Sequence, residues 1–365
     1  MSDQELVGSL PTAVQEQCIA RVPRRYHPAL KGVCKEFNEL FSTKRIYEVR
    51  SELKVKEDVL LVGLVNDDVP RMELEWFTLE TKVHDSEDMC ELRPAIPALS
   101  ENFTFSGYGP TYVSDGSSIY AICGGPKRDD ELPTTVYAVD YLESVCKPLQ
   151  LMVMGAPRPA SAVGIIQGKI YVLCVCGGSC VVQEYNIEGS DSDPPRWESF
   201  NIAFDEELED ICASFVMLDK IFIKFGWFSC VYDPTDRTLE RYDPIDDHWF
   251  ESSFKPSYCA IGKCLYVQDR EVDTIHVFDS ISENWSLLKG VAGKIDPCDF
   301  LRKKLVALGT RLAIDCSHEV EWEISVSIFD VERIDNECWG HQISRKVVLK
   351  PKSFYDIKEC LSFSI

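Results

Sequence analysis

Hydrophobic positions follow two different periods along the chain, and one gives way to the other near residue 50. Between residues 10 and 45, apolar side chains recur every three or four positions, which predicts short amphipathic helices. From about residue 55 they gather in short runs rich in Val, Ile, Tyr, Phe and Cys, separated by turn residues, which predicts β-strands. We therefore expect a helical unit at 1–50 and a mainly β unit at 51–365.

Two helices are predicted in the first unit. Pro11 is placed to open the first one, where its missing N–H does no harm, and Thr12 with Gln15 has the spacing of a capping box. Pro23 ends this helix, and His27–Pro28 opens the second. The apolar stripes comprise Val14, Cys18, Ile19, Val22, Ala29, Leu30, Val33, Cys34, Phe37, Leu40 and Phe41. Helices this short cannot bury both stripes alone, so they either dock on the rest of the chain or present apolar surface to another protein.

The β unit is repetitive. An aromatic residue recurs at intervals of about 46 to 60 residues within the pairs Trp76–Phe77, Val136–Tyr137, Glu184–Tyr185, Val231–Tyr232, Val277–Phe278 and Ile328–Phe329. A period near 50 with several strands per unit is typical of propeller blades, so we predict a β-propeller of about six four-stranded blades. The first unit lacks an opening strand. We expect the strand-like run Cys360–Ile365 to supply it and close the ring.

Charge separates the two units further. The net charge is −22, yet the first 50 residues hold eight Lys/Arg and six Asp/Glu, so the acidic excess belongs to the β unit. Such a body repels phosphates and anionic lipids, and we expect neither nucleic acid nor membrane as a partner. Neither a secretory signal nor a long apolar run is visible, which predicts cytoplasm and/or nucleus and 16 mostly reduced cysteines.

No spacing typical of a catalytic or metal site is found. Cys174, Cys176 and Cys180 cluster on a strand-like run without the paired spacing of zinc ligands, so buried thiols are the favoured interpretation. Cys316 and His318 would share a strand face, but nothing orients the histidine as a base. We therefore expect no catalytic residue, no metal and no cofactor, and a protein that is not an enzyme.

Both units resemble known families. The helical unit resembles the F-box, especially its plant F-box/kelch form, in Leu10–Pro11, Cys18–Pro23, His27–Leu30, Val33–Phe37 and Leu40. The β unit resembles the kelch repeat in its doublets Gly124–Gly125 and Gly177–Gly178, in Tyr232–Asp233 with Trp249, and in Phe278–Asp279 with Trp285. The resemblance implies the substrate-recognition subunit of a Skp–cullin–F-box ubiquitin ligase. Its F-box would bind a Skp-family adaptor, and through it a cullin, while its propeller would bind the target protein.

The resemblance also implies site residues. The adaptor contacts of the family correspond here to Leu10, Pro11, Val14, Ile19, Val22, Pro23, Leu30, Val33 and Phe37. The family often has acidic residues after the Leu-Pro pair, where this chain has Thr12–Ala13. Candidate substrate contacts between strands are Lys127, Arg128, Trp227 and Phe228.

Two other functions stay open. A kelch scaffold without a ligase role would use the helices only as a cap on the propeller, with the Leu10–Phe37 stripe covered. An enzyme would require a polar cluster at the central channel.

Overall fold

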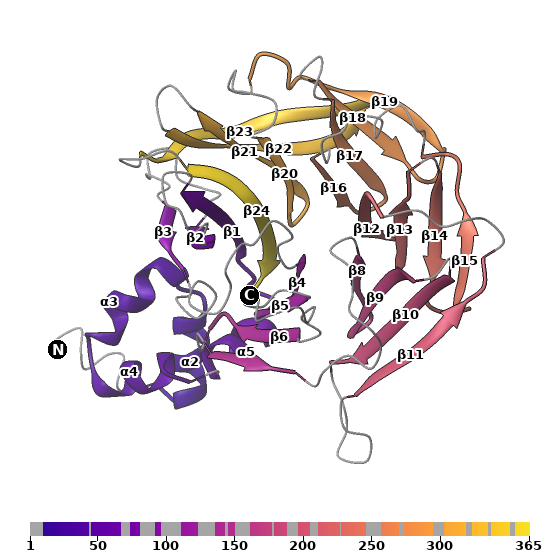
Figure 1. Ribbon diagram of the computed structural model, residues 1–365. Coiled ribbons are helices and arrows are strands. Elements are labelled where there is room, and N and C mark those ends of the chain that lie inside the picture. The colour runs from indigo at the N-terminus through magenta and orange to yellow at the C-terminus, as the bar shows by residue number, and fades with distance from the viewer. Residues whose placement is uncertain are drawn as a thin grey trace.

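The computed structural model describes residues 10–43, 45–66, 74–80, 92–95, 111–122, 136–142, 145–149, 161–176, 179–187, 196–204, 211–226, 228–245, 257–269, 274–294, 303–318, 323–334, 337–350 and 355–365. Small β-sheets stand around a common centre, and a group of short helices lies at one side of the ring (Figure 1). The predicted fold class, a mainly β propeller with a small helical unit, is confirmed.

Among the residues that the structure describes, the strands form six antiparallel blades of four strands each, two of them joined in one sheet. The first three are β24 (Tyr355–Ser364), β1 (Asp58–Asn66), β2 (Leu74–Glu80) and β3 (Leu92–Pro94); β4 (Thr111–Asp115), β5 (Ser118–Ile122), β6 (Val136–Asp140) and β7 (Val145–Pro148); and β8 (Ala162–Ile166), β9 (Lys169–Cys176), β10 (Ser179–Asn186) and β11 (Trp197–Ile202). The others are β12 (Ala213–Met217), β13 (Lys220–Lys224), β14 (Ser229–Asp233) and β15 (Thr238–Arg241); β16 (Tyr258–Ile261), β17 (Cys264–Asp269), β18 (Thr274–Asp279) and β19 (Asn284–Lys289); and β20 (Lys303–Leu308), β21 (Arg311–His318), β22 (Glu323–Ile334) and β23 (Glu337–Leu349).

The aromatic period marks the same strand of every blade. The six recurring pairs lie on β2, β6, β10, β14, β18 and β22, which are the third strands outward from the centre. Five of the six aromatic side chains are buried, namely Phe77, Tyr185, Tyr232, Phe278 and Phe329. Six apolar clusters fill the six spaces between neighbouring blades, so each blade is stabilised mainly by burial against its two neighbours.

The ring closes where the last strand meets the first. β24 pairs antiparallel with β1, with Leu361 opposite Leu61 and Phe363 opposite Val59. Just beyond the strands, Glu57 and Ile365 exchange two backbone hydrogen bonds of 2.9 and 3.0 Å. A segment from the end of the chain therefore supplies the inner strand of the first blade and pairs the edge of β1 that would otherwise be free.

Blades five and six are joined in a way that the sequence did not predict. The outer strand β23 reaches back to β19, with Leu288 opposite Cys338 in a parallel pairing. Only glycine fits at this crossing, because a Cβ on Gly340 would lie 2.5 Å from Cγ2 of Val291. The two blades therefore form one eight-stranded sheet.

The helical unit contains α2 (Thr12–Ala20), η1 (Arg24–Tyr26), α3 (His27–Lys31), α4 (Lys35–Phe41) and α5 (Arg45–Glu52). The predicted capping box is wrong: Pro11 is the N-cap, and the Gln15 side-chain amide donates to the Leu10 carbonyl oxygen at 2.7 Å. The predicted second helix is two helices, because Cys34 adopts an extended conformation. Among the described helices, none is long and apolar enough to cross a membrane.

Candidate functional site

The helices enclose a core of their own beside the ring. Its buried members are Ile19, Ala20, Phe41, Ile46 and Val49, with Leu30, Phe37, Leu40, Tyr47 and Leu53 packed around them. Ile19 is only 6% exposed. Its expected role as an adaptor contact is therefore not supported by this conformation, because α2 turns this side chain toward α5.

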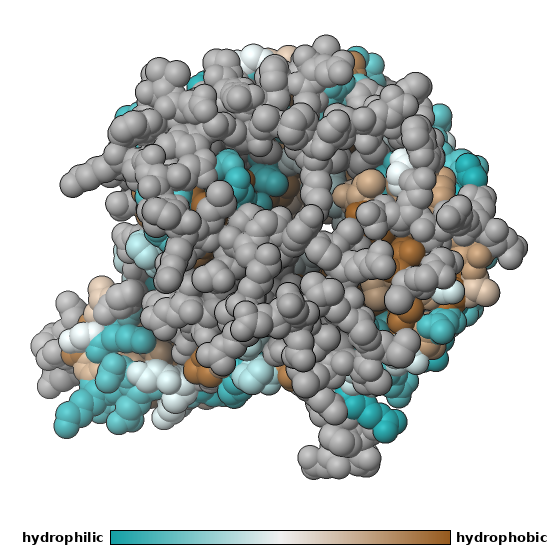
Figure 2. All heavy atoms as spheres, in the orientation of Figure 1, coloured by the Kyte–Doolittle hydropathy of each residue, from teal (hydrophilic) through white to brown (hydrophobic). Residues whose placement is uncertain are grey.

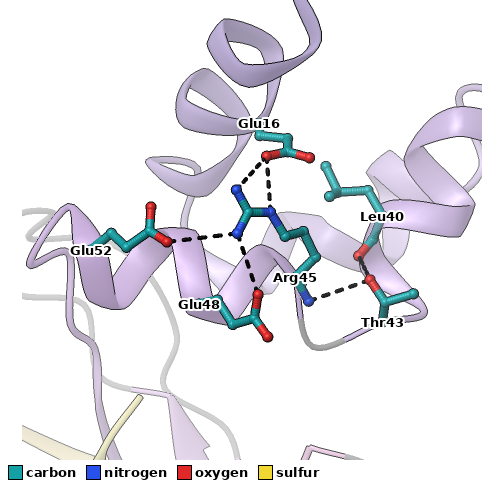
Figure 3. Close-up of polar contacts among 6 residues, drawn as sticks. All are labelled: Glu16, Leu40, Thr43, Arg45, Glu48 and Glu52. Atoms are coloured by element: carbon teal, nitrogen blue, oxygen red, sulfur yellow. Dashed lines mark hydrogen bonds and ion pairs between the residues drawn. The ribbon is translucent and has the colours of Figure 1, made fainter.

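Arg45 joins the two ends of the helical unit (Figure 3). From the start of α5 its guanidinium reaches Glu16 of α2 at 3.0 Å, Glu48 at 3.3 Å and Glu52 at 3.6 Å. All three pairs lie near the surface, where water and salt screen an ion pair and it adds little to stability. The pair with Glu16 connects α2 to α5, whereas the pairs with Glu48 and Glu52 lie within α5.

A buried arginine connects the helices to the propeller. Arg50 of α5 is fully buried, and its guanidinium donates to the carbonyl oxygens of Ala20 at 2.7 Å and Val22 at 3.1 Å. The same group pairs with the Glu57 carboxylate at 2.8 Å, immediately before β1. Glu57 also accepts from the backbone N–H of Arg24. One carboxylate therefore fixes the helical unit at the seam where the ring closes.

A second contact supports this junction. The Arg24 guanidinium lies 5.1 Å from the centre of the Tyr141 ring, which follows β6. Tyr141 in turn meets Phe363 of β24 edge-on at 5.1 Å. Because both contacts involve the seam between the first two blades, the helices and the ring share one interface there.

Changing Glu57 to Gln tests the junction. The buried Arg50 guanidinium would lose its charge partner and keep only carbonyl acceptors, so we expect the helical unit to lose about 1–3 kcal/mol of stability. Hydrogen exchange of α2 and α5 measures this loss. Glu52→Gln is the matched control, since Glu52 is 66% exposed and its pair with Arg45 lies at the surface, where it adds little to stability. Equal exchange in the two variants would contradict a structural role for Glu57.

His27 is an uncharged histidine within the same unit. It is 5% exposed, and its Nε2 lies 3.0 Å from the Val22 carbonyl oxygen. Burial lowers the pKa of His27 to about 4, although the Val22 carbonyl raises it, and the positive charge of Arg50 lowers it further. Nε2 carries the proton that Val22 accepts, while Nδ1 has no hydrogen-bond partner among the described residues. A second proton on the ring would therefore be poorly accommodated.

Because His27 stays neutral when folded, we expect the helical unit to lose stability in mild acid. The unfolded side chain takes up a proton as the pH falls below about 6.5, whereas the folded one stays neutral down to about 4. We expect the helical unit to lose about 2 kcal/mol between pH 7.5 and pH 5. His27→Gln keeps a donor for Val22 and does not titrate, so this part of the loss should vanish in thermal melts of the variant. Parallel pH dependence of variant and wild type would refute the assignment.

Several apolar residues of the helical unit face outward. Leu10 and Val14 at the start of α2 are each 40% exposed, and Val33, between α3 and α4, is 54% exposed. Pro11 and Pro23 are also exposed, while Val22, Leu30 and Phe37 are half-buried. In Figure 2 brown and pale residues appear among teal ones over this end of the molecule.

Sequence reasoning missed one member of this exposed group. Tyr26 is 45% exposed and lies in the 3₁₀ turn η1 between the two prolines of the segment. An isolated aromatic in a turn was the only signal for it, because it belongs to no apolar stripe.

Of the candidate substrate contacts, the structure describes only Phe228. Lys127, Arg128 and Trp227 lie outside the described residues. Phe228 is 8% exposed, and its ring stacks on Phe225 at 5.1 Å. In this conformation Phe228 therefore belongs to the cluster between blades three and four, and it offers little surface to a partner.

The structure describes the side chains of two of the three clustered cysteines. Cys174 and Cys180 are buried free thiols in the β9–β10 hairpin, and burial raises the pKa of Cys180 to about 12. The side chains of Cys316 and His318 lie outside the described set. In the described parts of the chain, no group of three or more His, Cys, Asp or Glu side chains is arranged to hold a metal ion.

Known proteins similar to this chain share both of its units. The profile described as "FKB95, Kelch-repeats domain" matches residues 76–349. The F-box/kelch-repeat protein At4g39240 of Arabidopsis thaliana is 30% identical over 98% of this chain and 90% of its own length. A second Arabidopsis protein, F-box/kelch-repeat protein At4g14905, is 30% identical over 86% of this chain and 79% of its own length. With the six-bladed ring and the helices beside it, these matches show that the chain belongs to the F-box/kelch-repeat family.

Proposed function

We propose that this chain is the substrate-recognition subunit of a Skp–cullin–F-box ubiquitin ligase, working in the cytoplasm, the nucleus or both. Its helical unit binds a Skp-family adaptor and, through the adaptor, a cullin. Its propeller binds the target protein. The chain performs no chemistry in this scheme: it holds target lysines close to a conjugating enzyme and so raises their effective concentration.

The exposed ridge Leu10, Pro11, Val14 and Val33 is the observation that carries this proposal. The helical unit already has a filled core, so these residues are not needed to complete it. Large apolar side chains that a small unit leaves exposed are available to bury against a protein partner. A ridge of aliphatic residues and proline also suits an apolar groove on another protein.

The junction supports the proposal in a second way. The Arg50–Glu57 pair and the Arg24–Tyr141 contact fix the helical unit against the first two blades. A fixed junction sets the distance between a bound adaptor and a bound target, and transfer of ubiquitin depends on that distance.

The same junction favours one other candidate function. A kelch scaffold without a ligase role would also need its helices docked on the ring. That alternative gives the exposed ridge no partner, and it explains fewer of the observations on the helical unit.

Binding of the full-length chain to a purified Skp-family adaptor, measured by calorimetry, tests the proposal. We expect a dissociation constant of about 1 µM or lower. The folded chain should also carry a cullin when adaptor and cullin are mixed with it, as shown by size-exclusion chromatography. Failure of the folded chain to bind several adaptors would leave the scaffold as the better account.

A further inference from the structure

The outer strand of blade six is much longer than the outer strands of the other blades. β23 has 13 residues, whereas the described parts of β3, β7, β11, β15 and β19 have 3, 4, 6, 4 and 6. It lies on the outside of the ring (Figure 1), and β22 pairs with one side of it along its whole length. The other side of β23 is therefore the longest outer sheet edge in the described part of the chain.

Only the first part of this edge is covered by a described segment. β19 pairs with it at Cys338 and Trp339, and the Lys294 carbonyl oxygen accepts from the Gln342 side chain at 3.2 Å. Over residues 343–349, no strand of the described chain pairs with the outer edge. Unpaired backbone N–H and C=O groups on such an edge are able to pair with a strand of another protein.

Two bulges limit how much of the edge a partner can use. The register between β22 and β23 shifts at Ile343 and again at Val348, each of which is an extra residue without a partner on β22. Bulges bend an edge and prevent a long strand from adding to it. Between them, residues 344–347 pair regularly with β22. A strand that adds here is therefore short.

Exposed side chains on this stretch are alternately apolar and basic. Ile343 and Val347 are 41% and 42% exposed, and Arg345 between them is also exposed. The intervening Ser344 and Lys346 are less exposed. We call Ile343, Arg345 and Val347 the edge strip. The side chains of an added strand would lie beside these three, because side chains on neighbouring strands are in contact.

The edge strip is basic, although the protein is acidic. Residues 338–350 contain three Lys/Arg and no Asp or Glu, whereas the whole chain has a net charge of −22. Lys350 pairs with Glu323 of β22, but Arg345 lies opposite the uncharged Ser327. An arginine has five N–H donors, so Arg345 is able to bind a carboxylate besides the contacts that it makes within the chain. The charge of the strip therefore favours an acidic partner.

The same charge disfavours a second copy of this chain as the partner. Two β23 edges that paired with each other would bring their basic residues together, and like charges on neighbouring strands are destabilising. A segment with a carboxylate between apolar side chains would instead complement each member of the strip.

We propose that β23 binds a short extended segment of another protein, which adds to its outer edge as a further strand. The segment has an acidic residue with an apolar residue two positions before it and another two positions after it. Its carboxylate pairs with Arg345, and its apolar side chains lie beside Ile343 and Val347. Its backbone pairs with residues 344–347. That the segment belongs to the target protein rests on the proposed function, whereas the binding itself does not.

Peptide binding to the full-length protein, followed by fluorescence anisotropy at about 50 mM salt, tests the proposal. The peptide Ser-Val-Thr-Glu-Thr-Val-Ser has the required pattern, and we expect a dissociation constant of about 100 µM or lower. With Gln in place of Glu it should bind at least about threefold more weakly, because the charge pair is lost. With methyl groups on its five central backbone nitrogens it has no N–H for the edge and should not bind. No binding of the first peptide at about 1 mM, or an analogue that binds as tightly, would overturn the proposal.

A charge swap assigns the contact to Arg345. Arg345→Glu should weaken binding of the acidic peptide at least about tenfold, because a repulsion replaces an attraction. The same variant should bind the peptide with Lys in place of Glu more tightly than wild type does. Arg196→Glu is the matched control, since Arg196 is 62% exposed and directly precedes β11, the outer strand of blade three. An equal loss in the two variants would show only a general attraction of charges and refute the assignment.

Sedimentation of the protein without peptide distinguishes a partner protein from a second copy. We expect a monomer at the concentrations used for the peptide. A dimer that the peptide dissociates would show that the edge pairs with another copy of the chain, which would contradict the proposal. Thermal melts show whether the variants are folded. Adaptor binding is measured separately and should be unchanged in Arg345→Glu, so failure of the peptide experiments leaves the ligase proposal intact.

Discussion

A chain that ends at Glu359 is expected to melt at least about 10 °C below the full-length protein. The cut removes most of the pairing between β24 and β1, including the buried side chains Leu361 and Phe363. Burial of each stabilises the fold by about 1.5–3 kcal/mol, and β1 would also gain an unpaired edge. Together these losses are a large fraction of the roughly 5–15 kcal/mol that stabilises a typical domain.

Calorimetric melts of both chains measure this effect. A double alanine variant and an added peptide test whether the last strand is its cause. Replacing Leu361 and Phe363 by alanine in the full-length protein should give a smaller loss, because the backbone pairing survives. Adding a peptide of residues 355–365 to the shortened chain should restore part of the melting temperature. Leu218→Ala is the control, since this side chain is 53% exposed in a turn. An unchanged melt of the shortened chain would show that the ring does not depend on this closure.

Replacing Leu10 and Val14 by aspartate is expected to lower the affinity for a Skp-family adaptor at least about 100-fold. The expectation rests on the proposed function. Each side chain is 40% exposed in the free protein and would enter an apolar groove on binding. A carboxylate in that groove loses its hydration without gaining a partner. The melting temperature should stay within a few degrees of wild type, because neither residue belongs to the helical core.

Leu218→Asp is a matched control for this variant. It places one such carboxylate at an exposed leucine far from the helices, where φ is +53°, a conformation that aspartate tolerates well. The control should bind the adaptor as wild type does. If the folded Leu10 and Val14 variant also binds as wild type, the ridge is not the adaptor surface.

The ring could be predicted from sequence because its signal is repeated. An aromatic on the third strand of each blade recurs at a nearly regular interval, and six copies of one pattern are hard to produce by chance. The pairing of β19 with β23 had no such signal. It depends on the backbones at Gly290 and Gly340 coming close together, which is a single tertiary event.

The helical unit was harder to interpret. Val14 and Ile19 belong to one apolar stripe, yet Val14 is exposed and Ile19 buried, because α5 covers only part of that stripe. No periodicity had indicated α5. The burial of Arg50 could not be predicted either, since arginine is almost always at the surface. Its pairing with Glu57 depends on the three-dimensional fold.

The distance along the chain between β1 and β24 has a consequence for protein synthesis. The helical unit and β1 leave the ribosome first, and β24 follows roughly 300 residues later, or roughly 15–60 s at ordinary elongation rates. During that interval the nascent chain already contains the helices, but β1 has no partner on its inner edge. Molecular chaperones that recognise unpaired strands would therefore meet this protein before its ring can close, and a stalled ribosome would hold it in that open form.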